Sequence, residues 1–75
     1  MIQLAHIQAM EELDFRESHG IAVSLLWNRN SNRLSVVVED RKVGESFALS
    51  ARPENALDVF RHPYAYALAQ PRLAA

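Results

Sequence analysis

The chain has no cysteine, and this absence excludes two common ways of stabilising a small protein. It can form neither a disulfide framework nor a thiolate metal site. Its 75 residues allow a single small domain, residues 1–75. A domain of this size buries only about 60% of the surface that its unfolded chain exposes. Association with a second copy would bury more apolar surface, so the size of the chain favours a homodimer.

Glycine, basic charge and long apolar runs are also scarce. The only glycines are Gly20 and Gly44, which cannot build a Gly-rich phosphate-binding loop. The net charge of −1 lacks the basic excess typical of nucleic-acid-binding proteins. The uncharged segment from Gly20 to Asn28 is too short to cross a bilayer. Acidic residues such as Glu11 and Glu12 occur where a signal peptide would be uncharged, so we expect a cytoplasmic protein without membrane association.

What the chain does have is alternation of apolar and other residues in three segments with turn residues between them. Such a period of two indicates antiparallel strands with one strongly apolar face. The apolar positions are Ile21, Val23, Leu25 and Trp27, then Leu34, Val36 and Val38, and finally Phe47 and Leu49. The sequence therefore predicts a three-stranded antiparallel meander.

The register of both hairpins follows from matching apolar positions. One register pairs Val23 with Val38, Leu25 with Val36 and Trp27 with Leu34, and it leaves residues 29–32 as a loop. A second register pairs Val38 with Phe47 and Val36 with Leu49, and it leaves residues 41–44 as the next loop. Asparagine in the first loop and Gly44 in the second suit left-handed backbone conformations.

A helix is predicted after the third strand. Ser50 can cap this helix, Pro53 suits its first turn, and Glu54 is favourable at the positive end of the helix dipole. Pro63 disfavours a helical His62, so the helix should end or kink there, and a second short turn can follow before Pro71. On the first helix, Ala56, Leu57 and Phe60 are expected to share one face.

The N-terminal segment is predicted to be a helix. Leu4, Ile7, Met10 and Leu13 recur every three residues, which is close to one face of a helix. The pair His19-Gly20 would end this helix before the sheet. An additional edge strand is the alternative. The strand Ile21–Trp27 has no charged residue, so we expect residues 1–15 or the same strand of a second copy to protect its edge.

These elements predict an α+β fold, in which a three-stranded antiparallel meander has an N-terminal helix and a C-terminal helix packed on its apolar face. The predicted core consists of the apolar positions that face this helix. They are Val23, Leu25, Trp27, Leu34, Val36, Val38, Phe47, Leu49, Leu57 and Phe60.

Residues that could carry chemistry are few and dispersed. His6, His19 and His62 lie in three different segments, without the i, i+3 or i+4 spacing of a metal site. Ser18 is adjacent to His19 in sequence, which is no reason to expect a hydrogen-bonded pair, and no serine lies in a Gly-x-Ser-x-Gly elbow. The sequence therefore predicts no enzyme, no cofactor and no metal. An enzyme would require an apolar pocket with convergent titratable groups.

Candidate interface residues come from two regions. The other face of the sheet is mixed, but its centre brings Leu26, Val37 and Ala48 together, either as scattered surface residues or as a contact layer. Near the C-terminus, Tyr64 and Tyr66 either complete the core over Trp27 or form an intermolecular surface. The predicted interface residues are Val23, Ser24, Leu26, Val37, Ala48, Tyr64 and Tyr66.

Four segments carry a resemblance to known sequences. They are Leu-Leu-Trp-Asn (25–28), Gly-Glu-Ser-Phe (44–47), Ala-Leu-Asp-Val-Phe (56–60) and His-Pro-Tyr-Ala-Tyr-Ala (62–67). From Gly20 to Ala67 the chain resembles small actinobacterial proteins of unknown function that end in a similar His-Pro-aromatic-Ala pattern. This resemblance implies a bacterial cytoplasmic protein and carries over no activity, cofactor or site residue.

The leading functional hypothesis is a non-catalytic interaction or accessory protein, which forms a homodimer or binds another protein. The alternative is a small regulator that contacts nucleic acid through the face of the sheet that carries Arg33 and Ser35. In this alternative, affinity would fall steeply as salt rises, whereas apolar association would not weaken in this way.

Overall fold

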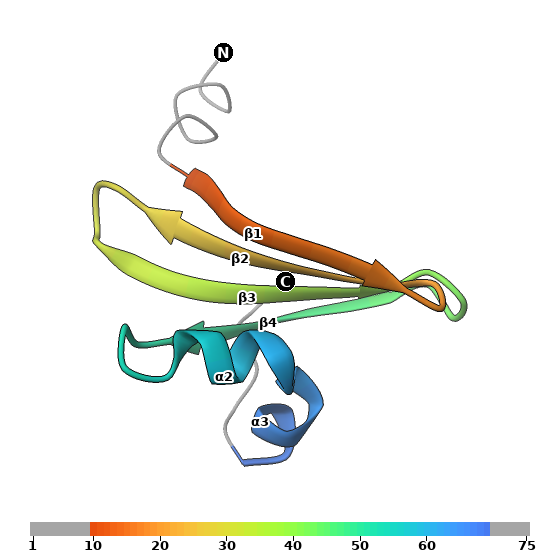
Figure 1. Cartoon of the computed structure of the whole chain (residues 1–75). Helices are drawn as coiled ribbons and strands as arrows, with labels where there is room; N and C mark the ends of the chain where they lie inside the picture. The colour runs from red at the N-terminus through yellow and green to blue at the C-terminus, as the bar shows by residue number, and fades with distance from the viewer. Residues whose placement is uncertain (1–9, 70–75) are drawn as a thin grey trace.

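The computed structural model describes residues 10–69 and shows a four-stranded antiparallel sheet in the order β1-β2-β3-β4 (Figure 1). The strands are β1 (Met10–Ser18), β2 (Ile21–Asn28), β3 (Arg33–Asp40) and β4 (Glu45–Ala51). Two short helices follow, α2 (Ala56–Arg61) and α3 (Pro63–Ala69). The α+β class is confirmed, but the predicted three-stranded sheet with an N-terminal helix is wrong.

The N-terminal segment is the main correction, because from Met10 onward it is strand β1 rather than a helix. The turn at His19-Gly20 explains the difference. Both residues have positive φ, 54° and 79°, as in the two-residue turns that join adjacent antiparallel strands. The turn therefore places Ser18 opposite Ile21 and starts a hairpin instead of ending a helix. The remaining part of the predicted helix, including Leu4 and Ile7, lies outside the described residues.

Strand β1 pairs with β2 and covers its edge. Of the two expected forms of protection, this is the one in which the N-terminal segment covers the edge. Strand β1 also carries the devices that discourage further strand pairing at a sheet edge, which are charged residues and a β-bulge. Its charged residues are Glu11, Glu12, Asp14, Arg16 and Glu17.

The turn at His19-Gly20 and the bulge between Glu12 and Asp14 together decide which side chains of β1 face the core. Counted from the turn, Arg16 lies opposite Val23 on the apolar face, and Phe15 lies opposite Ser24 on the other face. The bulge reverses the alternation before Asp14. Glu12 therefore lies opposite Leu26, whereas uninterrupted pairing from the turn would place it opposite Trp27 on the apolar face.

Both predicted registers are confirmed. Val23 faces Val38 and Trp27 faces Leu34 in the first hairpin, and Val38 faces Phe47 in the second. The loops span residues 29–32 and 41–44 as expected. Asn32 and Gly44 adopt the left-handed conformation, with φ of 58° and 72°.

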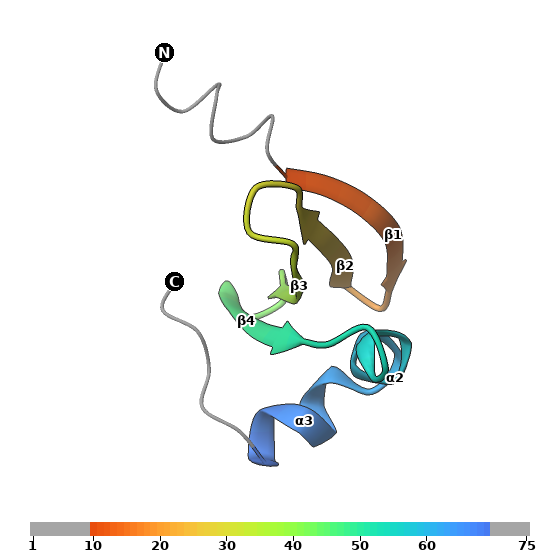
Figure 2. The same cartoon turned by 90° about the vertical axis from the view of Figure 1, so that its left-hand side faces the viewer.

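The helices cover one face of the sheet, which curls around α2 (Figure 2). The core between these layers consists of Val23, Leu25, Val36, Val38, Leu49, Ala56, Val59 and Phe60. Six of the ten predicted core residues belong to this set, while Trp27, Leu34 and Phe47 are half-buried. Within residues 10–69, neither helix has the length and apolarity needed to span a membrane.

Leu57 is the core residue that was predicted incorrectly, because 55% of it is exposed. Val59 occupies the core in its place and is fully buried. Ala56 and Phe60 lie one helical turn apart, and either Leu57 or Val59 can share a face with them. The spacing of apolar residues therefore left the rotation of α2 about its axis undetermined.

The first helix starts later than predicted, whereas the predicted break between the two helices is present. Ser50 does not cap a helix, because β4 continues to Ala51 and Ser50 pairs with Ser35. The turn before α2 is held by Asn55, whose Oδ1 accepts a hydrogen bond of 2.8 Å from the backbone N–H of Arg52. The predicted interruption at His62-Pro63 is confirmed, with Pro63 as the first residue of α3.

We predict opposite outcomes for two Leu→Asp substitutions. Leu25→Asp should prevent folding, because Leu25 is 4% exposed and the carboxylate would be buried without a partner. Leu57→Asp should change the free energy of unfolding by no more than about 0.5 kcal/mol, because the residue lies on the exposed side of α2. Thermal unfolding followed by circular dichroism would measure both. A cooperative, wild-type-like transition for Leu25→Asp would contradict the assigned core.

Candidate functional site

Two surfaces of the molecule are candidates for function, one on each side of the sheet. The first, here called the open face, is the side of the sheet away from α2 and α3. Its residues alternate with those of the core face and occupy corresponding positions in the strand registers. They are Met10, Glu12, Phe15, Glu17, Ala22, Ser24, Leu26, Asn28, Arg33, Ser35, Val37, Glu39, Ser46, Ala48 and Ser50.

The centre of the open face is apolar. Phe15, Ser24, Val37 and Ala48 form one row across the four strands, and Leu26 lies in the next row. Phe15 is 45% exposed, and the other apolar members of this group are half-buried. These five residues therefore form a continuous patch, which we call the central patch.

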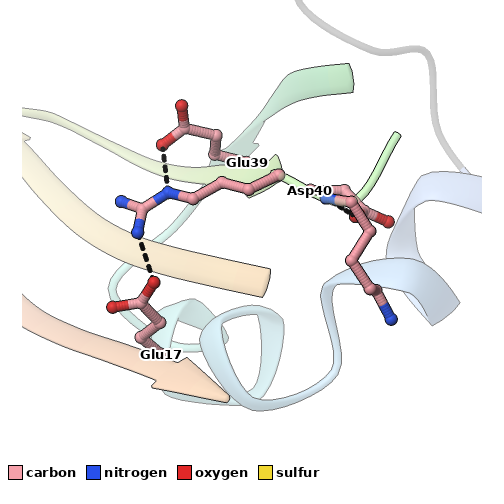
Figure 3. Close-up of polar contacts among 5 residues, drawn as sticks. Glu17, Glu39 and Asp40 are labelled. Atoms are coloured by element: carbon pink, nitrogen blue, oxygen red, sulfur yellow. Dashed lines mark hydrogen bonds and ion pairs between the residues drawn. The ribbon is translucent and has the colours of Figure 1, made fainter. Parts of the chain in front are cut away.

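An arginine crosses the open face beside the central patch. Arg41 forms ion pairs with Glu17 on β1 and, at 3.5 Å, with Glu39 on β3. Its guanidinium lies between these two carboxylates, across strand β2 (Figure 3). The arrangement accounts for the burial of Ala22, the β2 residue between Glu17 and Glu39. It also neutralises part of the acidic charge at this end of the face.

The predicted interface residues separate into three groups. Ser24, Leu26, Val37 and Ala48 lie together in the central patch. Val23 is only 1% exposed and belongs to the core on the opposite side of the sheet. Tyr64 and Tyr66 lie on α3, also away from the open face. Sequence reasoning missed Phe15, because the segment that contains it was interpreted as a helix.

The two tyrosines make different contacts within the chain. The ring of Tyr64 meets that of Phe47 edge to face, at a centroid distance of 5.5 Å. The hydroxyl of Tyr66 donates a hydrogen bond of 2.5 Å to Oδ2 of Asp58 and thereby joins α3 to α2. This hydrogen bond raises the pKa of Tyr66 above its ordinary value, and desolvation and the negative charge of Asp58 add to the shift.

The second surface is a pocket of about 410 Å³ between the β1–β2 hairpin and the junction of α2 and α3. Its apolar lining comes from Ile21, Val23, Pro63 and Ala65. Its polar lining consists of Arg16, Ser18, His19, Arg61, His62 and Tyr64. The volume falls within the range of about 300–1,000 Å³ that is usual for small-molecule sites.

The pocket brings together residues that are far apart in sequence. His19 and His62 line the same pocket, whereas His6 lies outside the described residues. Ser18 Oγ lies 2.7 Å from Nδ1 of His19, so these neighbours do form a hydrogen bond, contrary to the expectation from sequence. The hairpin turn causes this contact, because His19 adopts a positive φ and its ring returns toward Ser18.

Arg16 forms one wall of the pocket and connects the two layers of the fold. Its Nη2 donates hydrogen bonds to the main-chain oxygens of Phe60, at 2.9 Å, and Arg61, at 3.1 Å. The guanidinium carbon also lies 5.4 Å from the centroid of the Phe60 ring. These oxygens belong to the last residues of α2, where carbonyls have no partner within the helix. Arg16 therefore caps α2 from strand β1.

Comparison with protein-family models, curated proteins and solved structures finds no match to this chain. The site must therefore be interpreted from its own residues. Among the residues that the structure describes, His, Asp and Glu side chains form no group of three that could hold a metal ion.

Removal of the Arg16 cap should destabilise the fold. Arg16→Met keeps most of the aliphatic chain but loses both hydrogen bonds, which should cost about 1–3 kcal/mol of unfolding free energy. The control is Arg52→Met, because the guanidinium of Arg52 makes an exposed ion pair with Glu54 at 3.6 Å. Such a pair contributes at most about 1 kcal/mol. Urea unfolding would measure both variants, and equal losses would contradict the capping role.

The contact between Tyr66 and Asp58 should be detectable by titration. In a Tyr64→Phe background, Asp58→Asn should lower the pKa of Tyr66 toward about 10. Because the folded pKa is raised, the interaction stabilises the protein below about pH 10 and is lost as the pH rises through the folded value. Tyrosinate absorbance would give the pKa in both proteins. An unchanged titration after Asp58→Asn would show that the carboxylate does not control the phenol.

Proposed function

We propose that this chain is a non-catalytic interaction protein of the cytoplasm, which forms a homodimer through the open face of its sheet. The observation that carries the proposal is the position of Phe15. The register set by the turn at His19-Gly20 places this large apolar side chain opposite Ser24, at the centre of an exposed face. Contiguous exposed apolar patches often mark sites of protein–protein interaction.

The open face has a shape suited to packing against a second sheet. Small side chains at Ser24, Ser35, Ala48 and Ser50 surround Leu26 and Val37, so Phe15 is the largest side chain of the central patch. Sheets pack face to face at about 10 Å through interdigitating side chains. A second copy would bury the central patch in this way and would add to a core of modest size.

The charges at the two ends of the open face support an antiparallel arrangement of the copies. Arg33 lies at one end, and the pair Glu17 and Glu39, bridged by Arg41, lies at the other. The bridged cluster has two carboxylates and one guanidinium, so its net charge is negative. A two-fold axis that lies between the two sheets, parallel to them and perpendicular to the strands, brings Arg33 of each copy toward the acidic cluster of the other.

The same charges oppose the nucleic-acid alternative. The strands place Glu12, Glu17 and Glu39 on the face that carries Arg33, and Arg41 compensates only part of this negative charge. A phosphate backbone would therefore approach an acidic surface. We expect no salt-dependent binding of duplex DNA by this face.

Two substitutions on the open face test the dimer. Wild-type protein should dimerise at about micromolar concentration, and Phe15→Ser or Ser24→Lys should raise the dimer dissociation constant by at least about tenfold. Phe15→Ser removes the largest apolar side chain of the patch, and Ser24→Lys places a charge between Phe15 and Val37. Sedimentation equilibrium would measure the constant, with circular dichroism to verify folding.

The matched control is Val43→Ser, which removes an apolar side chain that is 64% exposed in the loop between β3 and β4. This variant should dimerise like the wild type. A wild-type protein that stays monomeric throughout the micromolar range would refute the proposed function. Equal association of Phe15→Ser and Val43→Ser would exclude the open face as the interface.

A further inference from the structure

We propose that the pocket between the β1–β2 hairpin and the α2–α3 junction binds a small organic anion, with a carboxylate or phosphate head and an apolar body. The pocket lies on the helix-covered side of the sheet, so this proposal does not depend on dimerisation through the open face. Three properties of the pocket support it: the charge of its lining, the apolar character of its walls, and the fixed position of Arg16.

Among the residues that the structure describes, the lining carries positive charge without a carboxylate. Arg16 and Arg61 are both cationic, and His19 and His62 add imidazoles beside them. Asp40 on β3 and Glu45 on β4 lie in the same cross-strand row as the pocket residue Ile21, but neither of them lines the pocket. In addition, Oδ1 of Asp40 accepts a hydrogen bond of 3.0 Å from the backbone N–H of Lys42. From residues 10–69, an anion in this pocket therefore meets donors and no carboxylate in the lining.

The polar groups offer the hydrogen bonds that an anionic head requires. A guanidinium has five N–H donors in a planar fork that matches a carboxylate or a phosphate. Arg16 donates to the two carbonyl oxygens of α2 through Nη2, and within residues 10–69 its Nε and Nη1 carry the remaining donors. The Ser18 hydroxyl and the His19 ring add further polar groups at the hairpin end of the pocket.

The apolar lining selects a ligand with an apolar body. Ile21 and Val23 come from the sheet, Pro63 and Ala65 come from α3, and the Tyr64 ring lies beside them. Inorganic phosphate would leave these walls in contact with water, whereas an aryl or acyl group would cover them. The expected class is therefore aryl or acyl carboxylates and phosphate esters.

The guanidinium of Arg16 is held in place before a ligand arrives, because its bonds to the end of α2 restrict the side chain. A fixed guanidinium loses less conformational entropy on binding than a free one.

Titration with phenyl phosphate, followed by amide chemical shifts in the NMR spectrum, tests the proposal. The shifts should map to His19, His62 and Ala65, with a dissociation constant of about 1 mM or lower. Inorganic phosphate lacks the apolar body and phenol lacks the charge, so each should bind at least about tenfold more weakly. Rising salt should weaken phenyl phosphate binding and leave phenol binding unchanged.

Two variants separate the contributions of charge and shape. Arg61→Gln should weaken phenyl phosphate binding by at least about fivefold and leave phenol binding unchanged, since it removes charge alone. Ala65→Leu should weaken both ligands, because it fills space at an exposed pocket position. The control is Arg52→Gln, which alters an exposed arginine that does not line the pocket.

The proposal would be overturned by any of three results. Equal affinity for phenol and phenyl phosphate would refute it, because the cationic lining would then contribute nothing. Shifts that map away from the pocket, or equal effects of Arg61→Gln and Arg52→Gln, would also refute it. The oligomeric state measured in the same samples shows independently whether the open-face dimer is present.

Discussion

The structure depends on one contact, in which Arg16 of β1 donates to the two carbonyl oxygens at the end of α2. This contact connects the first strand of the sheet to a helix that follows all four strands. It depends on the hairpin turn at His19-Gly20, whose register places Arg16 opposite Val23 on the core face. The same register places Phe15 opposite Ser24 and turns it outward. One two-residue turn thus determines how α2 is capped, which charge borders the pocket, and which side chain stands at the centre of the open face.

The central part of the fold could be predicted because its signals are local and agree with one another. In β2 and β3, apolar residues alternate without interruption, and only one register matches them on a single face. The loops contain residues that tolerate the left-handed conformation, Asn32 and Gly44. Pro63 likewise marks a boundary for a steric reason that does not depend on tertiary contacts.

Strand β1 could not be recognised from periodicity, because the bulge interrupts its alternation. The recurrence of Met10 and Leu13 at a spacing of three favoured a helix, while in the sheet Met10 pairs with Asn28 and Leu13 is the extra residue at the bulge. Two signals pointed to the correct structure. The high charge of residues 11–17 is typical of an edge strand, and His19-Gly20 can form a two-residue hairpin turn.

The candidate sites were harder to predict than the fold, because they depend on where separate segments meet. Leu26, Val37 and Ala48 were identified from register alone, but Phe15 joins them only through the register that the turn at His19-Gly20 sets for β1. The pocket is a stronger example, since Ser18 and His62 belong to segments that only the docking of α2 brings together.

The separation of the two surfaces by the sheet has a physical consequence for any function. Residues of one strand alternate between the faces, so Phe15 and Arg16 are neighbours in sequence but contribute to different surfaces. A substitution at Phe15 changes the open face without altering the lining of the pocket, and a substitution at Arg61 does the reverse. Strand β1 is the element shared by both surfaces. A change in its register would therefore move Arg16 away from α2 and Phe15 away from the central patch at the same time.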